Sequence, residues 1–213
     1  MSEVKNRRPL KSRSSPWAAR AAALLARLGV RPNAISAMST VFAMIGAALF
    51  IASAHQPDRV RGALLVGAAL SIQLRLVCNL LDGMVAIEGG KKSAVGVIYN
   101  EFPDRVADSL LIVALGYGVG WPAVGWLGAL AAALIAYIRV FGGSLGLPQD
   151  YRGPMAKQQR MAVLTAACAA GAAEHLLTGT QYALLAAAVI IAVGSVVTCI
   201  VHTGALAARL KDV

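Results

Sequence analysis

The chain has 213 residues and a net charge of +10 at neutral pH, with 58% of its residues hydrophobic and 14% charged. Soluble globular domains have about 45–50% apolar and roughly 25% charged residues, so the composition argues against an ordinary soluble protein. Several apolar runs are long enough to cross a bilayer, which indicates an all-α integral membrane protein. The length suggests a single membrane domain over residues 1–213.

The first element that we expect is an amphipathic helix over residues 14–30, lying on the cytoplasmic surface of the membrane. Ser15 and Pro16 suit the N-cap and the first helical position. Apolar residues from Trp17 to Leu28 recur at helical spacing, and the arginines fall elsewhere on the helix. A cleavable signal peptide fits less well, because arginines interrupt the apolar stretch.

Six hydrophobic segments follow, which predict a bundle of six transmembrane helices over residues 34–204. They cover residues 37–54, 62–85, 102–120, 121–145, 161–177 and 181–201. The second and third segments are the weakest in hydropathy, because acidic residues interrupt them.

Basic residues are unequally divided between the two predicted sides of the membrane. Fifteen flank one side, whereas only Arg59 and Arg61 flank the other. By the positive-inside rule the first side is cytoplasmic, which predicts a multi-pass protein of the inner (cytoplasmic) membrane with both termini inside. This topology explains the positive charge, so we expect no nucleic-acid partner.

Residues 79–108 contain five of the ten acidic residues of the chain. A charged group within a span costs a few kcal/mol or more, and it usually faces a cavity or a partner. Two helical faces carry the polar and small residues of this stretch. The first face holds Asn79, Asp82, Gly83 and Ala86, and the second holds Gly96, Asn100, Asp104 and Asp108. A glycine-rich turn between them predicts an antiparallel hairpin with Asp82 opposite Asp104.

Converging carboxylates repel one another unless cations bind them. Oxygen ligands without His or Cys favour hard ions such as Mg²⁺ or Mn²⁺, and a pair of such ions is common in phosphoryl chemistry. The alternative is that the acids form ion pairs with the three intramembrane arginines, Arg75, Arg105 and Arg139.

The same stretch resembles the signature of the CDP-alcohol phosphotransferase family, Asp-x-x-Asp-Gly-x-x-Ala-Arg, eight residues, then Gly-x-x-x-Asp-x-x-x-Asp. Five positions match, namely Asp82, Gly83, Ala86, Gly96 and Asp104. Three depart, since Asn79 and Asn100 replace aspartates and Ile87 replaces the arginine. The segments "GVRPNAIS" and "RGPMAKQQR" are also similar to family segments, and the six-span layout covers nearly the whole chain.

The resemblance implies an enzyme of phospholipid biosynthesis whose active site faces the cytoplasm. It would transfer a phosphatidyl group from a CDP-linked lipid, such as CDP-diacylglycerol, to an alcohol and release CMP. By position, Asp104 matches the general base and a metal ligand. A homodimer among membrane lipids and a cofactor of Mg²⁺ or Mn²⁺, as two divalent ions, are also implied.

The expected site residues form two sets. The metal ligands are Asn79, Asp82, Asn100, Glu101, Asp104 and Asp108. Glu101 and Asp108 are included because they share the face of Asn100 and Asp104 and can replace the charge lost at the asparagines; Glu101 also has Arg105 as its i+4 neighbour. The substrate-binding residues are Asn33, Ser36, Gly83, Ala86, Arg139, Arg152, Lys157 and Arg160.

Two other functions stay open at this point. Loss of two motif aspartates favours a catalytically degenerate family member that binds lipid or nucleotide without turnover. In an ion-coupled transporter the acidic residues would line an ion path. That hypothesis gives no role to the glycines or to the basic residues in 152–160. The acceptor alcohol cannot be read from the sequence.

Overall fold

The computed structural model describes residues 15–88, 96–148, 150–178, 180 and 182–211, and for residues 58, 59, 88, 97, 100, 175 and 176 it describes the helical backbone alone. These ranges contain seven helices and no strand. They are α1 (Pro16–Arg27), α2 (Pro32–Ser53), α3 (Asp58–Glu88), α4 (Gly96–Gly118), α5 (Pro122–Ser144), α6 (Lys157–Leu177) and α7 (Tyr182–Lys211). The predicted all-α class is confirmed.

Proline and glycine mark several helix boundaries. Three helices, α1, α2 and α5, begin with a proline, which has a fixed φ and lacks the N–H that would have no partner at that position. After α1 and α4 the chain turns at Gly29 and Gly120, both with φ of 75°. This left-handed conformation suits glycine, because it has no Cβ to clash with the backbone.

Four helices are long and apolar enough to cross a membrane, namely α2, α3, α5 and α7. This establishes the multi-pass membrane character, whereas the count of six spans stays a prediction. The remaining long helices, α4 and α6, contribute most of the charged residues that face one another inside the bundle.

α1 packs against the end of α3. Ala18 and Ala22 are fully buried against Leu81 and Val85, while Trp17 on the other side of α1 is half exposed. The helix therefore has a buried face and an exposed apolar face. Its position on the membrane surface stays a prediction.

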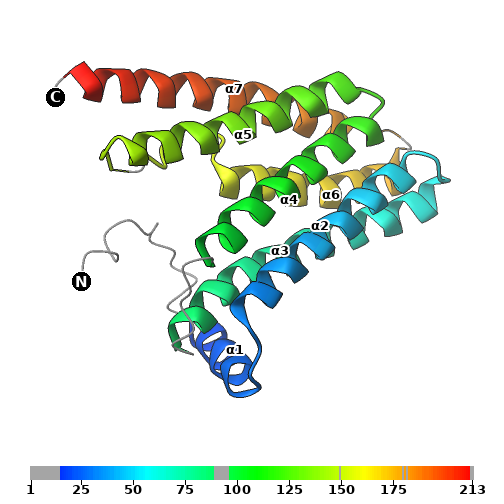
Figure 1. Ribbon diagram of the computed structural model, residues 1–213. Helices are drawn as coiled ribbons and strands as arrows, with labels where there is room; N and C mark the ends of the chain where they lie inside the picture. The colour runs from blue at the N-terminus through cyan, green and yellow to red at the C-terminus, as the bar shows by residue number, and fades with distance from the viewer. Residues whose placement is uncertain (1–14, 89–95, 149, 179, 181, 212–213) are drawn as a thin grey trace.

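The other helices form a bundle in which α3 runs antiparallel to α2 and α5 antiparallel to α4, whereas α4 runs parallel to α2 and α7 parallel to α5 (Figure 1). α2 contacts α3 and α4, α4 contacts α5, α5 contacts α7, and α6 contacts both α3 and α7. The connections between α2 and α3, α4 and α5, and α6 and α7 lie at one end, whereas the α5–α6 connection lies at the other (Figure 1). The arrangement agrees with the in-and-out path expected of a polytopic protein.

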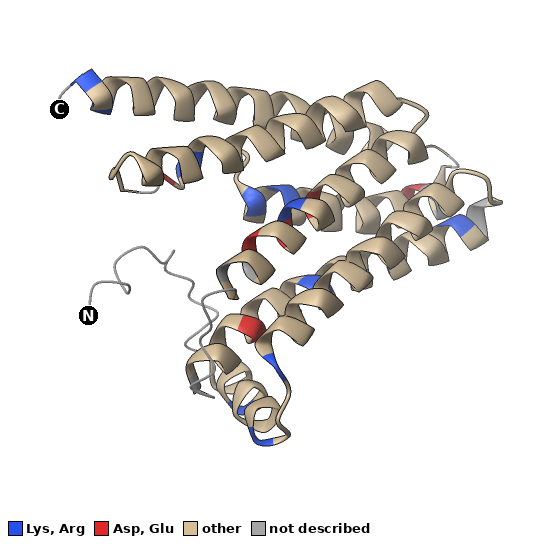
Figure 2. Cartoon of the chain, in the orientation of Figure 1, with Lys and Arg blue, Asp and Glu red and all other residues tan. Residues whose placement is uncertain are grey.

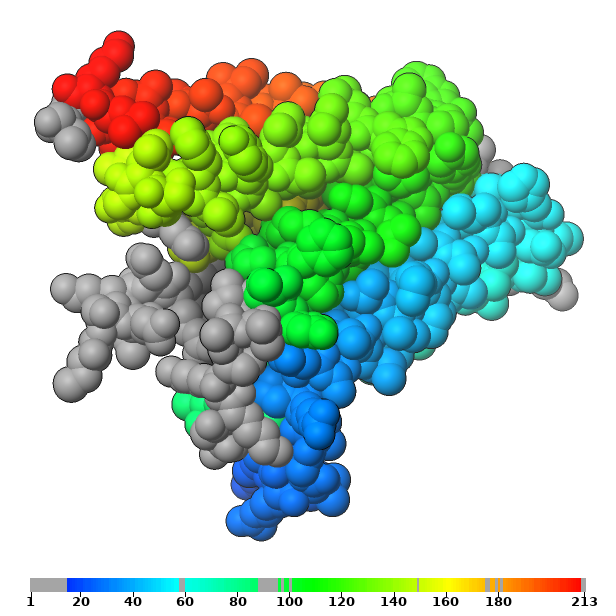
Figure 3. Space-filling view, viewed as in Figure 1, coloured from blue at the N-terminus to red at the C-terminus, as the bar shows by residue number. Residues whose placement is uncertain are grey.

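Small residues let α4 and α5 approach closely. A Cβ on Gly116 would lie 2.7 Å from the Cα of Gly125, so the two backbones are in contact at this crossing. α4 thereby lies between α2 and α5, as the green surface between blue and yellow-green shows in Figure 3. The start of α4, which carries the acidic residues, faces α3 and α6 as a result.

Large apolar side chains cover the outer surface of the bundle. On α5 and α7 they include Trp126, Leu130, Tyr137, Ile190 and Ile200, each at least half exposed. An apolar surface of this extent indicates contact with lipid rather than water.

Opposite ends of the bundle offer two labelling positions. Gln56, between α2 and α3, and Arg152, between α5 and α6, are both exposed. In a variant lacking the three native cysteines, we expect Arg152→Cys to react with a membrane-impermeant maleimide only from the cytoplasm and Gln56→Cys only from the other side. Labelling of both from the same side of sealed vesicles contradicts this topology.

Candidate active site

Three helices bring charged side chains together inside the bundle. Asp104 and Asp108 come from α4, Arg75 comes from α3, and Lys157 and Arg160 come from the first turns of α6. Figure 2 shows the acidic segments of α4 beside the basic start of α6.

Asp108 lies between two arginines at the centre of this group. One carboxylate oxygen accepts a hydrogen bond from Arg75 at 2.7 Å, and the other accepts one from Arg160 at 2.8 Å. The Asp108 side chain is 3% exposed and those of Arg75 and Arg160 are 0% and 1% exposed. Each charge is thus paired where water cannot solvate it, and this cluster ties α3, α4 and α6 together.

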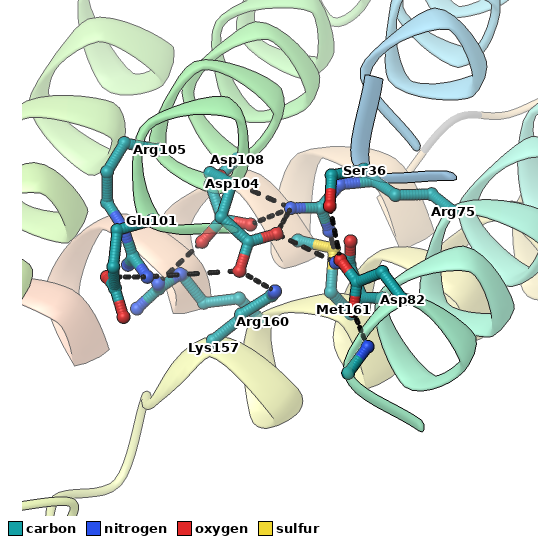
Figure 4. A network of polar contacts seen from close by, with 12 residues as sticks. Ser36, Arg75, Asp82, Glu101, Asp104, Arg105, Asp108, Lys157, Arg160 and Met161 are labelled. Carbon is teal, nitrogen blue, oxygen red and sulfur yellow. Dashed lines mark hydrogen bonds and ion pairs between the residues drawn. The ribbon is translucent and has the colours of Figure 1, made fainter. Parts of the chain in front are cut away.

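Asp104, one turn earlier on α4, has partners on both oxygens. Oδ1 accepts a hydrogen bond from the Asn79 amide at 2.7 Å and lies 3.4 Å from Arg75, whereas Oδ2 accepts one from the Lys157 ammonium (Figure 4). Its side chain is 13% exposed, against 3% for Asp108. Asp104 is therefore the more accessible of the two carboxylates.

Asp82 faces the same region from α3. Its carboxylate is buried and accepts a hydrogen bond of 2.6 Å from the Ser36 hydroxyl of α2 (Figure 4). Ser36, expected to bind substrate, thus contacts a second expected site residue directly. α3 and α4 both pack against α2, and the turn predicted between them lies outside the described residues, so the placing of Asp82 opposite Asp104 stays a prediction.

Glu101 has a different set of partners. Its Oε2 lies 2.7 Å from Arg139 of α5 and 3.2 Å from Arg105. Arg139 also lies over the ring of Tyr151, 5.4 Å from its centre. Glu101 thus forms the ion pairs described by the alternative interpretation of the sequence, and its side chain is 39% exposed.

The remaining expected residues lie on the α5–α6 connection, on α2, on α3 and on α4. Arg152 is 67% exposed and pairs with Asp150 at 2.7 Å, which holds the pKa of the Asp150 carboxyl well below its usual range. Asn33 is half-buried at the start of α2, and Gly83 and Ala86 are half-buried on α3. The side chain of Asn100 lies outside the described part of the structure.

The oxygen donors suit a hard cation. In the described part of the chain, no group of three His, Cys, Asp or Glu side chains is arranged to hold a metal. The available set is the carboxylates of Asp82 and Asp104 with the amide of Asn79. Mg²⁺ commonly takes one or two carboxylates and completes its shell with substrate phosphates and water, so these donors fit Mg²⁺ or Mn²⁺.

Arg75 is the main participant absent from the expected site. It bonds Asp108 and lies close to Asp104, and its other nitrogen donates to the Met161 sulfur at 3.1 Å. A sequence signal for it existed, because Arg75 precedes Asn79 by four residues and shares its helical face.

Comparison with known proteins gives two kinds of likeness. The chain is 32% identical over 187 residues to phosphatidylinositol phosphate synthase of Streptomyces avermitilis, covering 84% of this chain and 73% of that protein. No established family profile matches it.

The fold is similar to that of phosphatidylinositol phosphate synthase of Mycobacterium tuberculosis. The crystal structure with CDP-DAG bound has a TM-score of 0.75 at 19% identity, covering 90% of this chain and 94% of that one. The structure of the same enzyme with manganese and citrate has a TM-score of 0.73 at 20% identity, with 89% and 88% covered.

The Asp108 cluster generates a stability prediction. Asp108→Asn leaves two buried guanidinium groups without their shared carboxylate, so we expect the unfolding free energy to fall by about 3–5 kcal/mol. Thermal denaturation in detergent measures this. Asp150→Asn is the control, because its partners Arg152 and Arg209 are exposed or partly exposed, and we expect a much smaller loss. Equal losses in the two variants contradict a structural role for Asp108.

Proposed function

This chain belongs to the CDP-alcohol phosphotransferase family and transfers a phosphatidyl group from a CDP-linked lipid to an alcohol in phospholipid biosynthesis, and we propose that its acceptor is an inositol phosphate. The Streptomyces relative and the two structural neighbours, all phosphatidylinositol phosphate synthases, support this acceptor. The CDP-DAG bound in one neighbour supports CDP-diacylglycerol as the donor.

The observation that carries the site proposal is the environment of Asp104. It is the partly accessible carboxylate of the cluster, and Asn79, Arg75 and Lys157 hold it between α3 and α6. In the proposed mechanism Asp104 accepts the proton of the acceptor hydroxyl as that oxygen attacks phosphorus. Asp108 has both oxygens bonded to arginines, so we assign it the task of positioning Arg75 and Arg160.

Basic side chains around Asp104 are suited to bind phosphate groups. Arg139 and Arg105 share the single carboxylate of Glu101, which leaves an excess of positive charge at this edge of the site. Guanidinium groups bind phosphate oxygens through charge-assisted hydrogen bonds. We propose that Arg139 and the exposed Arg152 bind the acceptor phosphate, while Lys157 lies at the reacting groups.

A divalent cation, Mg²⁺ or Mn²⁺, is part of the proposal. Asp82 and Asp104 would hold it with the asparagines Asn79 and Asn100, and it would stabilise the negative charge that develops as CMP leaves. The manganese in a structural neighbour supports this. The presence of two ions stays a prediction.

The remaining parts of the site concern the lipid donor. Gly83 and Ala86 leave little bulk on α3, so we propose that the cytidine lies against them, near Asn33 and Ser36 of α2. In this arrangement α4 and α6 also cross the membrane, both termini and the site are cytoplasmic, and the protein is a homodimer.

The acceptor is tested with the purified protein in nanodiscs, CDP-diacylglycerol and Mn²⁺. We expect CMP release with inositol phosphate and none with inositol, glycerol 3-phosphate or serine. CMP release with another of these alcohols, and none with inositol phosphate, identifies that alcohol as the acceptor instead. Absence of release with every acceptor favours the catalytically degenerate alternative, and ion flux across proteoliposomes favours the transporter.

The role of Asp104 generates a kinetic prediction. Asp104→Asn removes the proton acceptor, so we expect turnover to fall by roughly 100-fold or more. Glu174→Gln removes one carboxylate at the opposite end of α6 and is expected to keep full turnover. The rate of CMP release measures both. Near-normal release by Asp104→Asn excludes Asp104 as the base.

A further inference from the structure

We propose that Thr198 and His202 of α7 are positioning residues for the transfer reaction, because they hold the α5–α6 connection in place. This connection covers residues 145–156 and includes Arg152. The inference rests on the proposed function, since it concerns how the groups that we assign to the acceptor phosphate are held. Both residues act through the connection and not by touching substrate.

His202 bonds the main chain of Arg152. Its Nε2 contacts the carbonyl oxygen of Arg152, and because a carbonyl oxygen only accepts, that nitrogen carries the proton. His202 is 3% exposed, whereas the side chain of Arg152 is 67% exposed. A buried donor on α7 therefore fixes the backbone of Arg152 while its guanidinium group stays accessible.

Thr198, one turn earlier on α7, bonds the main chain of Met155. Its hydroxyl donates to the carbonyl of Gly194 at 2.7 Å and accepts a hydrogen bond of 3.0 Å from the amide of Met155. The Met155 carbonyl accepts a hydrogen bond of 2.7 Å from Arg160, whose guanidinium also bonds Asp108. The backbone of Met155 thus links α7 to the buried charge cluster.

The connection also packs closely on α7 between these two bonds. Gly153 has a φ of 116°, which favours glycine, and a Cβ there would lie 2.5 Å from Cγ2 of Thr198. Nearer the C-terminus of α7, Arg209 donates to the carbonyl of Pro148 at 3.2 Å and lies 3.5 Å from Asp150. The connection therefore lies along one side of α7 over about three helical turns and runs in the opposite direction.

Both arginines assigned to the acceptor phosphate depend on this connection. Arg152 belongs to it, and Arg139 of α5 lies over the ring of Tyr151, 5.4 Å from its centre. The proposed cytidine position is on α2 and α3, whereas α7 packs against α4, α5 and α6. Lys157 lies within α6 and bonds Asp104. Loosening the connection is therefore expected to weaken acceptor binding and to leave donor binding and turnover at saturation unchanged.

Two substitutions of His202 differ in whether the new side chain can donate. Phenylalanine fills the space without a donor, whereas the amide nitrogen of glutamine can donate to the Arg152 carbonyl. In His202→Phe we expect the KM for inositol phosphate to rise about tenfold, as loss of one hydrogen bond allows, with kcat and the KM for CDP-diacylglycerol changed by less than about twofold. In His202→Gln we expect all three constants to stay close to those of the unaltered chain.

Three outcomes of this comparison overturn the inference. They are an unchanged KM for inositol phosphate in His202→Phe, an equal rise in His202→Gln, and a rise in the KM values of both substrates. Should His202→Phe not fold, the variant of Thr198 decides.

Thr198→Val removes the hydroxyl and keeps a β-branched side chain against Gly153. We expect a similar rise in the KM for inositol phosphate and faster hydrogen exchange at the Met155 amide without substrates. Thr203→Val is the matched control, because Thr203 is exposed and its hydroxyl donates to the Cys199 carbonyl of its own helix. It should change neither quantity. Unchanged exchange in Thr198→Val, faster exchange with an unchanged acceptor KM, or an equal effect in the control overturns the inference.

The unaltered chain separates this inference from the proposed function. Absence of CMP release with inositol phosphate by the unaltered chain contradicts the proposed acceptor, and the positioning roles fall with it. Release by the unaltered chain, together with any of the overturning results in the variants, leaves the proposed function standing and removes only the positioning roles of Thr198 and His202.

Discussion

The pairing of Asp108 with Arg75 and Arg160 is the interaction on which the rest of the site depends. It joins α3, α4 and α6 through bonds of 2.7 and 2.8 Å between fully buried groups. None of these charges is stable alone in an apolar bundle, so the three helices have to meet in the register that pairs them. This register sets the position of Asp104, one turn earlier on α4, against Asn79 and Lys157.

The same constraint accounts for the uneven hydropathy of the helices. α2, α3, α5 and α7 are apolar enough to span a membrane by composition, whereas α4 and α6 supply most of the charges of the site. Charged residues lower the hydropathy of a helix. The free-energy cost of burying them is offset once they pair with partners inside the bundle. The crossing of the membrane by α4 and α6 therefore stays a prediction, since hydropathy alone does not reveal a span that carries paired charges.

Asn79 and Asn100 lower the negative charge of the motif, but the site keeps its polar contacts. Asn79 keeps a bond to Asp104, and Arg75 and Lys157 bring positive charge to the same carboxylate. The network is thus held together by protein cations before any divalent ion is considered. Proton transfer and phosphate binding require an accessible carboxylate and nearby donors, and both are present.

The sequence by itself determined the helical class and the charge bias, because these follow from local periodicity and from the energy of moving charge into lipid. It did not determine which cation pairs with which acid. Spacing places Glu101 and Asp108 on one face, yet Glu101 turns to Arg139 and Asp108 to Arg160, which lie 38 and 52 residues away in the chain. The packing of α5 against α4 and of α6 against α3 decided this, because a helical face specifies only a direction and the neighbouring helices determine which side chains lie there.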